Sequence, residues 1–359
     1  MSEIPQALAG NVRTILVSRF FEGVFGSAIF AVVSGMMVDV WDPITRGVGL
    51  ALTATCINLG STVAPVVGGF VVATVGWRWT AGVTALYCSC LSIAGIFFIR
   101  ESFEPVLLAR KARKLRFRTR KWALHAKSEE SPHDIKVLIQ KYLTKPVRMF
   151  FSEPILIILT IYMTLVYGIL YLAYQAFPYS FQQRGWRADI SELPFIAIAL
   201  GILSAWGFFS LYTLTYYKTK AHRGQTCPED RVLPMIVGSL ILPPSLFWFG
   251  WSTYTHWTSQ IIAGYFIGLG LLLIFISGIV YLVDVYLINA NSAMSIHVVV
   301  RSIVASSFPL FATPMYNRLG TAWASTLLGF LCLLMVPFPL IFYFYGARIR
   351  SWSRFSFSM

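Results

Sequence analysis

Long apolar runs alternate with short polar interruptions along almost the whole chain. A bilayer core needs about 20 apolar residues of helix, and nine runs approach or exceed that length. They cover residues 14–38, 47–72, 79–99, 154–177, 193–216, 232–251, 258–283, 291–314 and 323–345. Odd and even positions are equally apolar, whereas the strands of a membrane barrel alternate in polarity. The pattern predicts an all-α integral membrane protein with about nine transmembrane helices.

Composition agrees with this prediction. Of the 359 residues, 57% are hydrophobic and only 12% are charged, which is more apolar surface than a water-soluble globule could bury. The longest polar stretch separates the first three runs from the last six. We therefore expect a partial helical bundle in residues 1–99, a basic linker in 100–150, a six-helix bundle in 151–346 and a cytoplasmic tail in 347–359.

The net charge of +14 lies mostly in that linker, where residues 100–148 hold 14 Lys and Arg against 5 Asp and Glu. This concentration argues against a nucleic-acid-binding surface. Short basic loops resist translocation, so the linker is expected to face the cytoplasm. It is either a solvated loop or a contact for anionic lipid headgroups.

The remaining loops follow the same orientation, because each span changes the side of the membrane. The cytoplasmic side receives Arg46, Lys218, Lys220, Arg223, Arg231, Arg348, Arg350 and Arg354. The outer side receives Arg13, Arg19, Arg78, Arg184, Arg187 and Arg318. With an odd number of spans the N-terminus is expected outside, and no removable signal peptide is visible in the first twelve residues.

Small residues recur at a spacing of four in two spans. Gly60, Ala64 and Gly68 share one helix face, with Pro65 and Gly69 one position further. The first span repeats the device with Gly23, Ser27, Ala31 and Gly35. Helices in lipid associate through such small residues, so we expect these two spans to pack closely. The stripes are either static packing or a seam along which the helices move.

The string from Gly60 to Gly69 is similar to the antiporter motif in the fifth helix of the major facilitator superfamily, with Ala64 in place of a glycine. Arg19-Phe-Phe-Glu-Gly23 is similar to the Arg-x-x-Gln-Gly motif of its fourth helix. Further matches are "DVWDPITRG", "GWRWT", "CPEDRVLPMIVG", "YLVD" and "VRSIVASSFPLF". The chain thus resembles the twelve-helix fungal drug:proton antiporters, over their helices four to twelve.

The resemblance implies a major facilitator fold without its first three helices, arranged as three plus six spans. It also implies proton-coupled efflux of a small organic compound, such as a drug, toxin or secondary metabolite, at the plasma membrane. The alternative is a truncated remnant, or an incomplete gene sequence, that does not transport. The expected partners are an organic substrate, protons and the bilayer, with no nucleic acid; the oligomeric state is left open.

An arginine inside a span is costly and normally finds a partner. Arg19 lies about five residues into the first span, and Glu22 is three residues further on the same helix. Arg19 either extends to the outer interface with Glu22 as its helper, or the pair couples proton binding to transport, as the resemblance implies.

Charged residues also lie near the ends of other spans. Asp39, Asp42 and Arg46 flank the first inner turn, and Asp284 and Arg301 bracket a later one. We interpret these residues as gate or anchor charges at the cytoplasmic ends of the helices, where charge pairs can close one end of a passage.

Three tyrosines line one span at spacings of four and three. Tyr167, Tyr171 and Tyr174, followed by Gln175, are either core packing or part of a path for a large amphiphilic or cationic organic molecule. Polyamine-carrying relatives tend to have glutamate where Gln175 stands, so the resemblance disfavours a polycation.

Enzymatic chemistry has little support in the sequence. The histidines are isolated, the five cysteines are scattered, and no phosphate-binding Gly-x-x-x-x-Gly-Lys-Ser/Thr string occurs. We therefore expect no enzymatic activity, no metal site, no cofactor and a gradient rather than ATP as the energy source.

Overall fold

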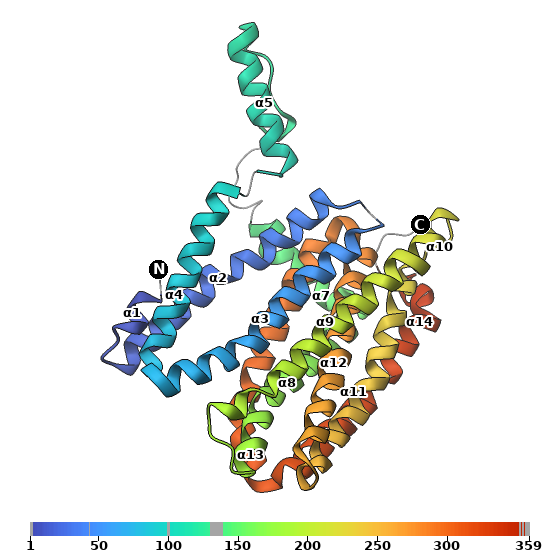
Figure 1. Ribbon diagram of the computed structural model, residues 1–359. Helices are drawn as coiled ribbons and strands as arrows, with labels where there is room; N and C mark the ends of the chain where they lie inside the picture. The colour runs from blue at the N-terminus through green and yellow to red at the C-terminus, as the bar shows by residue number, and fades with distance from the viewer. Residues whose placement is uncertain are drawn as a thin grey trace. The chain divides into compact units, whose positions relative to one another are not determined.

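The computed structural model describes residues 3–42, 44–98, 101–129, 139–351, 353 and 355, and all regular structure in these ranges is helical (Figure 1). The first elements are α1 (Ile4–Ala7), α2 (Val12–Val40), α3 (Arg46–Val75), α4 (Trp77–Phe98), α5 (Glu104–Thr119), η1 (Lys127–Glu129), η2 (Gln140–Thr144), α7 (Lys145–Ser152), α8 (Pro154–Gln183) and η3 (Ile190–Glu192). They are followed by α9 (Phe195–Tyr212), η4 (Thr213–Tyr217), α10 (Lys218–His222), η5 (Pro228–Val232), α11 (Leu233–Trp251), η6 (Ser252–Tyr254), α12 (Trp257–Tyr286), η7 (Leu287–Asn289), α13 (Ala290–Met335) and α14 (Pro337–Arg350). The prediction of an all-helical protein is confirmed.

Seven helical segments of the described residues are long and apolar enough to cross a membrane. The last covers residues 290–350 and contains two predicted spans, 291–314 and 323–345. Between them the backbone leaves helical geometry at Gly320, where φ is 72° and ψ is 166°. The count of nine spans and the correspondence to helices four to twelve stay predictions.

The chain divides into two compact units. The first contains Met1–Pro43 and Val75–Lys145, and the second contains Ile44–Thr74 and Pro146–Met359. α3 therefore belongs with the C-terminal helices, although it precedes the linker in sequence. The domain limits expected from the sequence stay a prediction, since they rested on span order rather than on contacts.

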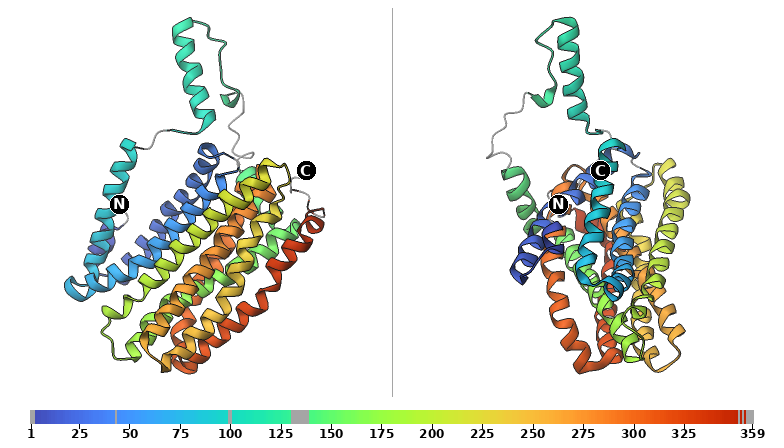
Figure 2. Two further views of the ribbon diagram at one scale, coloured as in Figure 1. Left: turned by 45° about the vertical axis from the view of Figure 1, so that its right-hand side comes forward. Right: turned by 60° about the vertical axis from the view of Figure 1, so that its left-hand side comes forward.

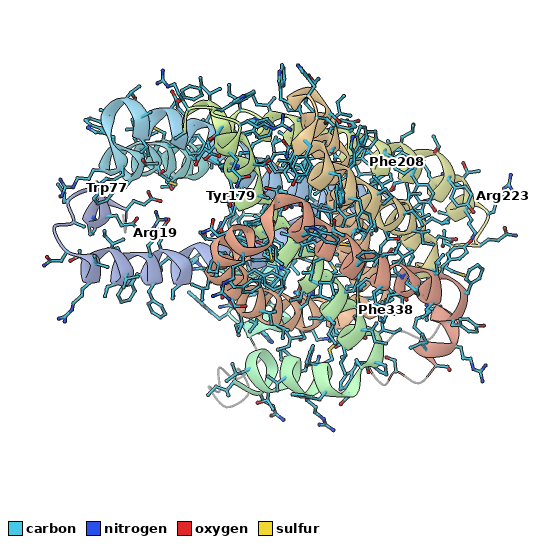
Figure 3. All side chains as sticks on the ribbon, turned by 90° about the horizontal axis from the view of Figure 1, so that it is seen from below. Arg19, Trp77, Tyr179, Phe208, Arg223 and Phe338 are labelled. Carbon is cyan, nitrogen blue, oxygen red and sulfur yellow. The ribbon has the colours of Figure 1, made fainter. Side chains whose placement is uncertain are left out.

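In the second unit the long helices run side by side (Figure 2), and α12 is the most buried of the membrane-capable helices. It packs against α9 and α11, while α8 packs against α13. A helix that is apolar on all sides is expected in the centre of a bundle. Large apolar side chains such as Phe208 are exposed on the outside of this unit (Figure 3), as a lipid-facing surface requires.

A buried carboxylate holds the C-terminal segment. Glu153 precedes α8 and accepts a hydrogen bond from the Tyr286 hydroxyl at 3.1 Å. It also accepts hydrogen bonds from the Ser353 hydroxyl and from the backbone N–H of Phe355, the latter at 3.0 Å. Asn289 donates to the Phe355 carbonyl at 3.1 Å. These contacts join the end of the chain to α8, α12 and η7.

α9 and α12 approach so closely that only glycine fits at their contact. A Cβ atom added to Gly201 would overlap the carbonyl oxygen of Tyr265 and lie 2.9 Å from the backbone nitrogen of Leu269. Small residues at such contacts let helices in lipid gain dispersion energy that the hydrophobic effect does not supply there.

We expect Gly201→Ala to lower the free energy of unfolding by about 1–3 kcal/mol, because the added methyl overpacks a backbone contact. Gly207 on the same helix is the matched control, since no described atom lies within 4 Å of a Cβ added there. Gly207→Ala should be neutral or slightly stabilising, because alanine favours helix. Thermal unfolding in lipid nanodiscs measures both, and equal losses would contradict the close contact.

Candidate functional site

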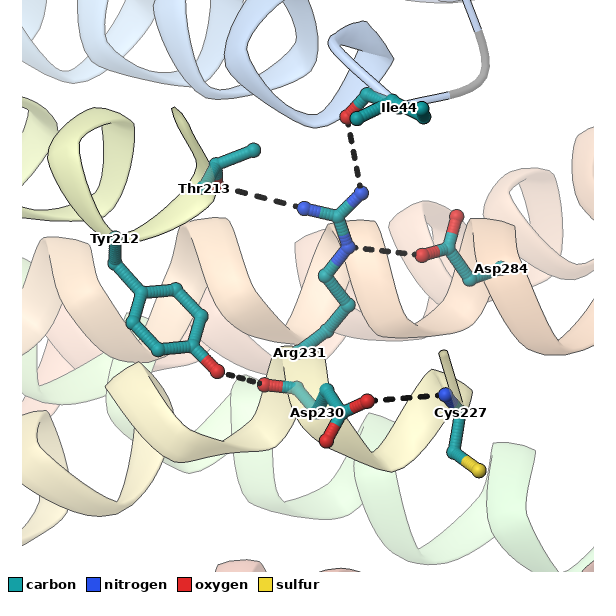
Figure 4. A network of polar contacts seen from close by, with 7 residues as sticks. All are labelled: Ile44, Tyr212, Thr213, Cys227, Asp230, Arg231 and Asp284. Atoms are coloured by element: carbon teal, nitrogen blue, oxygen red, sulfur yellow. Dashed lines mark hydrogen bonds and ion pairs between the residues drawn. The ribbon is translucent and has the colours of Figure 1, made fainter. Parts of the chain in front are cut away.

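A buried arginine joins three elements at one end of the second unit. Arg231 in η5 is fully buried and pairs with Asp284 of α12, with Nε 3.0 Å from the carboxylate oxygen Oδ2 (Figure 4). Its other nitrogens donate to the Thr213 hydroxyl and to the carbonyl of Ile44, each at 3.4 Å. Ile44 lies two residues before the first residue of α3. One guanidinium thus connects the start of α3 to η4 and α12.

The surroundings of Arg231 fit its shape closely. The guanidinium carbon lies 3.4 Å from the ring centroid of Tyr217, and a Cβ added to Gly47 would lie 2.8 Å from Nη1. The neighbouring Asp230 binds Lys220 at 2.6 Å and accepts from the backbone N–H of Cys227 at 3.0 Å. Removing one member of a buried pair leaves the other charge uncompensated, which costs about 3–5 kcal/mol.

The predicted gate residues are only partly brought together. Asp284 pairs with Arg231, and Arg46 also acts on Asp284 electrostatically. Asp42 is exposed and follows the end of α2, while the side chain of Asp39 lies outside the described residues. Sequence reasoning treated Arg231 as a loop charge only; its signal was the string "CPEDRV", where an arginine directly precedes an apolar run.

The three predicted path tyrosines form a continuous aromatic row on α8. The ring centroids of Tyr167 and Tyr171 are 5.1 Å apart, and those of Tyr171 and Tyr174 are 6.4 Å apart. Phe275 of α12 lies 5.4 Å from Tyr167, and Phe195 of α9 lies 5.6 Å from Tyr174. The row therefore presents flat apolar surfaces with hydroxyl groups at their edges, as aromatic ligands prefer.

Arg301 of α13 lies against this row. Its guanidinium carbon is 4.2 Å from the ring centroid of Tyr167 and 5.4 Å from that of Phe275. Such contacts contribute roughly 0.5–2 kcal/mol, whereas a charge at the centre of a membrane helix costs about 2.5–3.5 kcal/mol on insertion scales. The rings offset only part of that cost.

Several polar atoms near this row are buried and have no hydrogen-bond partner among the described residues. They are Nε of Arg301, Nε2 of His297 and Oε1 of Gln175. His297 is fully buried one helical turn before Arg301, and its Nδ1 is 3.2 Å from the Thr160 hydroxyl oxygen. Buried polar groups in folded proteins are normally paired, so these three atoms are candidate contacts for a ligand.

α3 contacts the bundle at three levels within the second unit. Besides Arg231 at its start, the Tyr174 hydroxyl bonds Ser61 at 2.9 Å and Thr62 at 3.0 Å. Near its other end, a Cβ added to Gly69 would lie 3.0 Å from Cγ of Glu192. The helix is continuous through Pro65.

The rest of the predicted stripe is less covered. Gly60 and Ala64 are exposed, and Pro65 and Gly68 are half-buried. Within this unit no described atom lies within 4 Å of a Cβ added to Gly60. The expected close packing of this face against the first span stays a prediction.

In the first unit the predicted pair Arg19–Glu22 has its nearest atoms 3.3 Å apart on α2. Sequence reasoning missed two neighbours: Gln6 of α1 donates to Glu22 at 2.7 Å, and the buried Glu3 shares a hydrogen bond with Glu22. Burial, and next the contact with Glu22, raises the pKa of Glu3 from 4.5 to about 7. This cluster can hold and release a proton near neutral pH.

We expect Arg231→Gln to lower the free energy of unfolding by about 3–5 kcal/mol, because Asp284 is left buried without its partner. Adding Asp284→Asn should recover part of the loss, since both charges are then gone. The control is Arg187→Gln, which removes an exposed guanidinium from its pair with Asp189 and should cost no more than about 1 kcal/mol.

Thermal unfolding in nanodiscs compares five proteins: the unaltered chain, Arg231→Gln, Asp284→Asn, the double variant and Arg187→Gln. If the double variant lost as much stability as the sum of the two single variants, the buried pair would not be energetically coupled.

Sequence comparison identifies relatives along nearly the whole chain. It is 45% identical to a citrinin biosynthesis cluster MFS transporter of Monascus ruber, over 99% of this chain and 72% of that protein. An ascochitine biosynthesis cluster MFS transporter of Didymella fabae is 44% identical, over 99% of this chain and 70% of its own length. A multidrug transporter of Candida glabrata is 37% identical, over 98% and 62%.

Residues 4–309 match the sequence profile of the Major Facilitator Superfamily, and they include α2, α3, the Arg231–Asp284 pair and the aromatic row. The relatives are named as transporters, and the described structure has the membrane-capable helices that such a protein needs. The chain belongs to the Major Facilitator Superfamily.

Proposed function

We propose that this membrane protein exports a small organic compound, a drug, toxin or secondary metabolite, in exchange for protons at the plasma membrane. The observation that carries the proposal is the cluster of Glu3, Glu22 and Arg19, which combines two carboxyl groups with one guanidinium. Two adjacent carboxyl groups share a proton, and the arginine changes the affinity of its neighbour for that proton.

The substrate path in this proposal follows the aromatic row on α8. Tyr167, Tyr171, Tyr174 and Gln175 provide flat rings and polar atoms inside the second unit. The names of the relatives refer to citrinin and ascochitine biosynthesis clusters and to multidrug transport, and they support a small organic compound as the substrate.

The gate in this proposal is the contact of Arg231 with Asp284 and with the start of α3, with Arg46 beside it. Alternating access requires contacts that close one end of a passage while the other end opens. The expected topology places Arg46 and Arg231 on the cytoplasmic side, so we assign this gate to the cytoplasmic end.

We expect an acid-inside pH gradient to drive accumulation of labelled citrinin into proteoliposomes, because outward proton flow then powers uptake. Citrinin is the first probe because one relative carries its cluster name. Glu22→Gln should reduce gradient-driven accumulation at least about tenfold, because the carboxylate that contacts both Glu3 and Arg19 is lost. Exchange without a gradient should persist.

Glu101→Gln, in the exposed linker, is the matched control and should transport normally. Protein-free vesicles and an uncoupler give the baseline. If Glu22→Gln accumulated citrinin as well as the unaltered chain, Glu22 would have no part in the coupling.

We also expect the contact of α1 with α2 to weaken as the pH rises through about 7. The pKa of Glu3 is raised in the folded state from 4.5 to about 7, so its contribution to stability is complete below pH 4.5 and is lost as the acid ionises beside Glu22. Hydrogen exchange of residues 4–22, corrected for its intrinsic pH dependence, should therefore be faster at pH 8 than at pH 5.5. Glu3→Gln should flatten this difference; an unchanged difference would assign it to another group.

A further inference from the structure

We propose that the Arg301 cluster, comprising Arg301, His297, Tyr167, Tyr171 and Phe275, binds an aromatic carboxylate. The inference rests on the proposed function, because it names the substrate class of the same path. It narrows the class expected from the sequence, which was an amphiphilic or cationic molecule, to an anion.

The acidic residues of the second unit are the counter-ions available to Arg301 within that unit. They are Glu153, Asp189, Glu192, Glu229, Asp230 and Asp284. Glu153 accepts hydrogen bonds from Tyr286 and from the backbone of Phe355. Four others form ion pairs: Asp189 with Arg187, Glu229 with Arg350, Asp230 with Lys220, and Asp284 with Arg231. Glu192 lies against Gly69 of α3. Arg301 therefore makes no ion pair with a carboxylate among the described residues of its own unit.

Burying the Arg301 guanidinium without a counter-ion costs free energy. Two rings contact the guanidinium, but Nε remains buried without a hydrogen-bond partner among the described residues. A buried cation without a counter-ion is unfavourable, and an anion that arrives beside it recovers the lost interaction. Because no carboxylate among the described residues of this unit supplies the negative charge, we assign that role to a ligand.

Aromatic rings lie against the Arg301 guanidinium. The guanidinium lies against the rings of Tyr167 and Phe275, which contact each other, and the row continues through Tyr171 to Tyr174, whose hydroxyl is bonded to α3. Flat rings of this kind stack on an aromatic ligand. The geometry therefore favours a molecule in which a carboxylate is attached to a planar ring system.

His297 provides a second hydrogen-bond donor near Arg301. His297 is fully buried on α13, four residues before Arg301, and its Nε2 has no partner among the described residues. Thr160 occupies its other ring nitrogen. In the tautomer in which Nδ1 accepts from Thr160, Nε2 carries the proton and can donate to one carboxylate oxygen while Arg301 binds the other.

The test compares three labelled probes with the same ring: 2-naphthoate, neutral 2-naphthamide and cationic 2-naphthylmethylammonium. Equilibrium binding to the purified chain in nanodiscs should favour naphthoate over the amide by at least about tenfold, with the ammonium weakest because of charge repulsion. Arg301→Gln should remove this preference and leave amide binding unchanged. Arg301→Lys should retain a preference for the anion, because it keeps the charge.

Lys218→Gln, an exposed cation of the same unit, is the control for general electrostatic attraction and should behave like the unaltered chain. Thermal unfolding identifies any variant that fails to fold; Arg301→Lys then carries the comparison. If Arg301→Gln unfolds at a lower temperature but keeps the naphthoate preference, Arg301 only joins α13 to α8 and the inference is overturned. Equal affinity of the unaltered chain for all three probes overturns it too.

The same proteins in vesicles separate this inference from the proposed function. Selective naphthoate binding without proton-driven movement supports the anion site and contradicts the exporter. Proton-driven movement of the amide or the ammonium, equal in the unaltered chain and in Arg301→Gln, supports the exporter and overturns the anion site.

Discussion

A guanidinium removed from water must find a partner, and the second unit of this protein depends on how two arginines meet that requirement. Arg231 has a carboxylate, a hydroxyl, a backbone carbonyl and an aromatic ring around it. Arg301 has two aromatic rings. Apolar attraction between helices is weak in lipid, so such polar contacts and close backbone approaches decide which helices belong together. The chain supplies hydrogen-bond partners for all three nitrogens of Arg231. Arg301 keeps a buried Nε without a hydrogen-bond partner among the described residues.

The sequence predicted the helices well because their signal is local. A run of about 20 apolar residues specifies a membrane helix without any knowledge of its neighbours. Asp284 could be selected as a candidate because a carboxylate at the end of an apolar span is unusual. Its partner could not be selected, since Arg231 lies 53 residues earlier and no helical periodicity relates two residues at that distance.

Arg301 shows the opposite case. It was grouped with Asp284 near a cytoplasmic turn, yet α13 begins at Ala290, so Arg301 lies roughly 16 Å along that helix. The depth of a residue within a span can be counted from the sequence. The side chains that contact that residue cannot be identified in this way. The tyrosines of α8 share one face by spacing alone, and that face was predictable. The arrival of Arg301 from α13 at the same face required the fold.

The position of α3 explains how these features work together. Its buried residues are concentrated in its first half, at Gly47, Gly49, Leu50, Ala51, Ala54 and Thr55, with Thr62 further along. Beyond Thr62 the helix is largely uncovered, and Gly60 and Ala64 are exposed. The start of α3 is thus fixed by a charged, fully buried contact, whereas its second half contacts the bundle through the hydrogen bonds of Ser61 and Thr62 with Tyr174 and through the Gly69 contact with Glu192.

This asymmetry has a mechanical consequence for the second unit. Separating α3 from the bundle at its start requires Arg231 to leave Ile44 and Gly47, while Asp284 can keep its partner. The charge pair therefore does not have to break when the helix moves; only the 3.4 Å hydrogen bond to Ile44 and the close contact with Gly47 change. A net hydrogen bond contributes about 0.5–1.5 kcal/mol, which is small enough for the proposed transport cycle to form and break it repeatedly. A gate built around a retained ion pair can be specific in its closed position and still open at low cost.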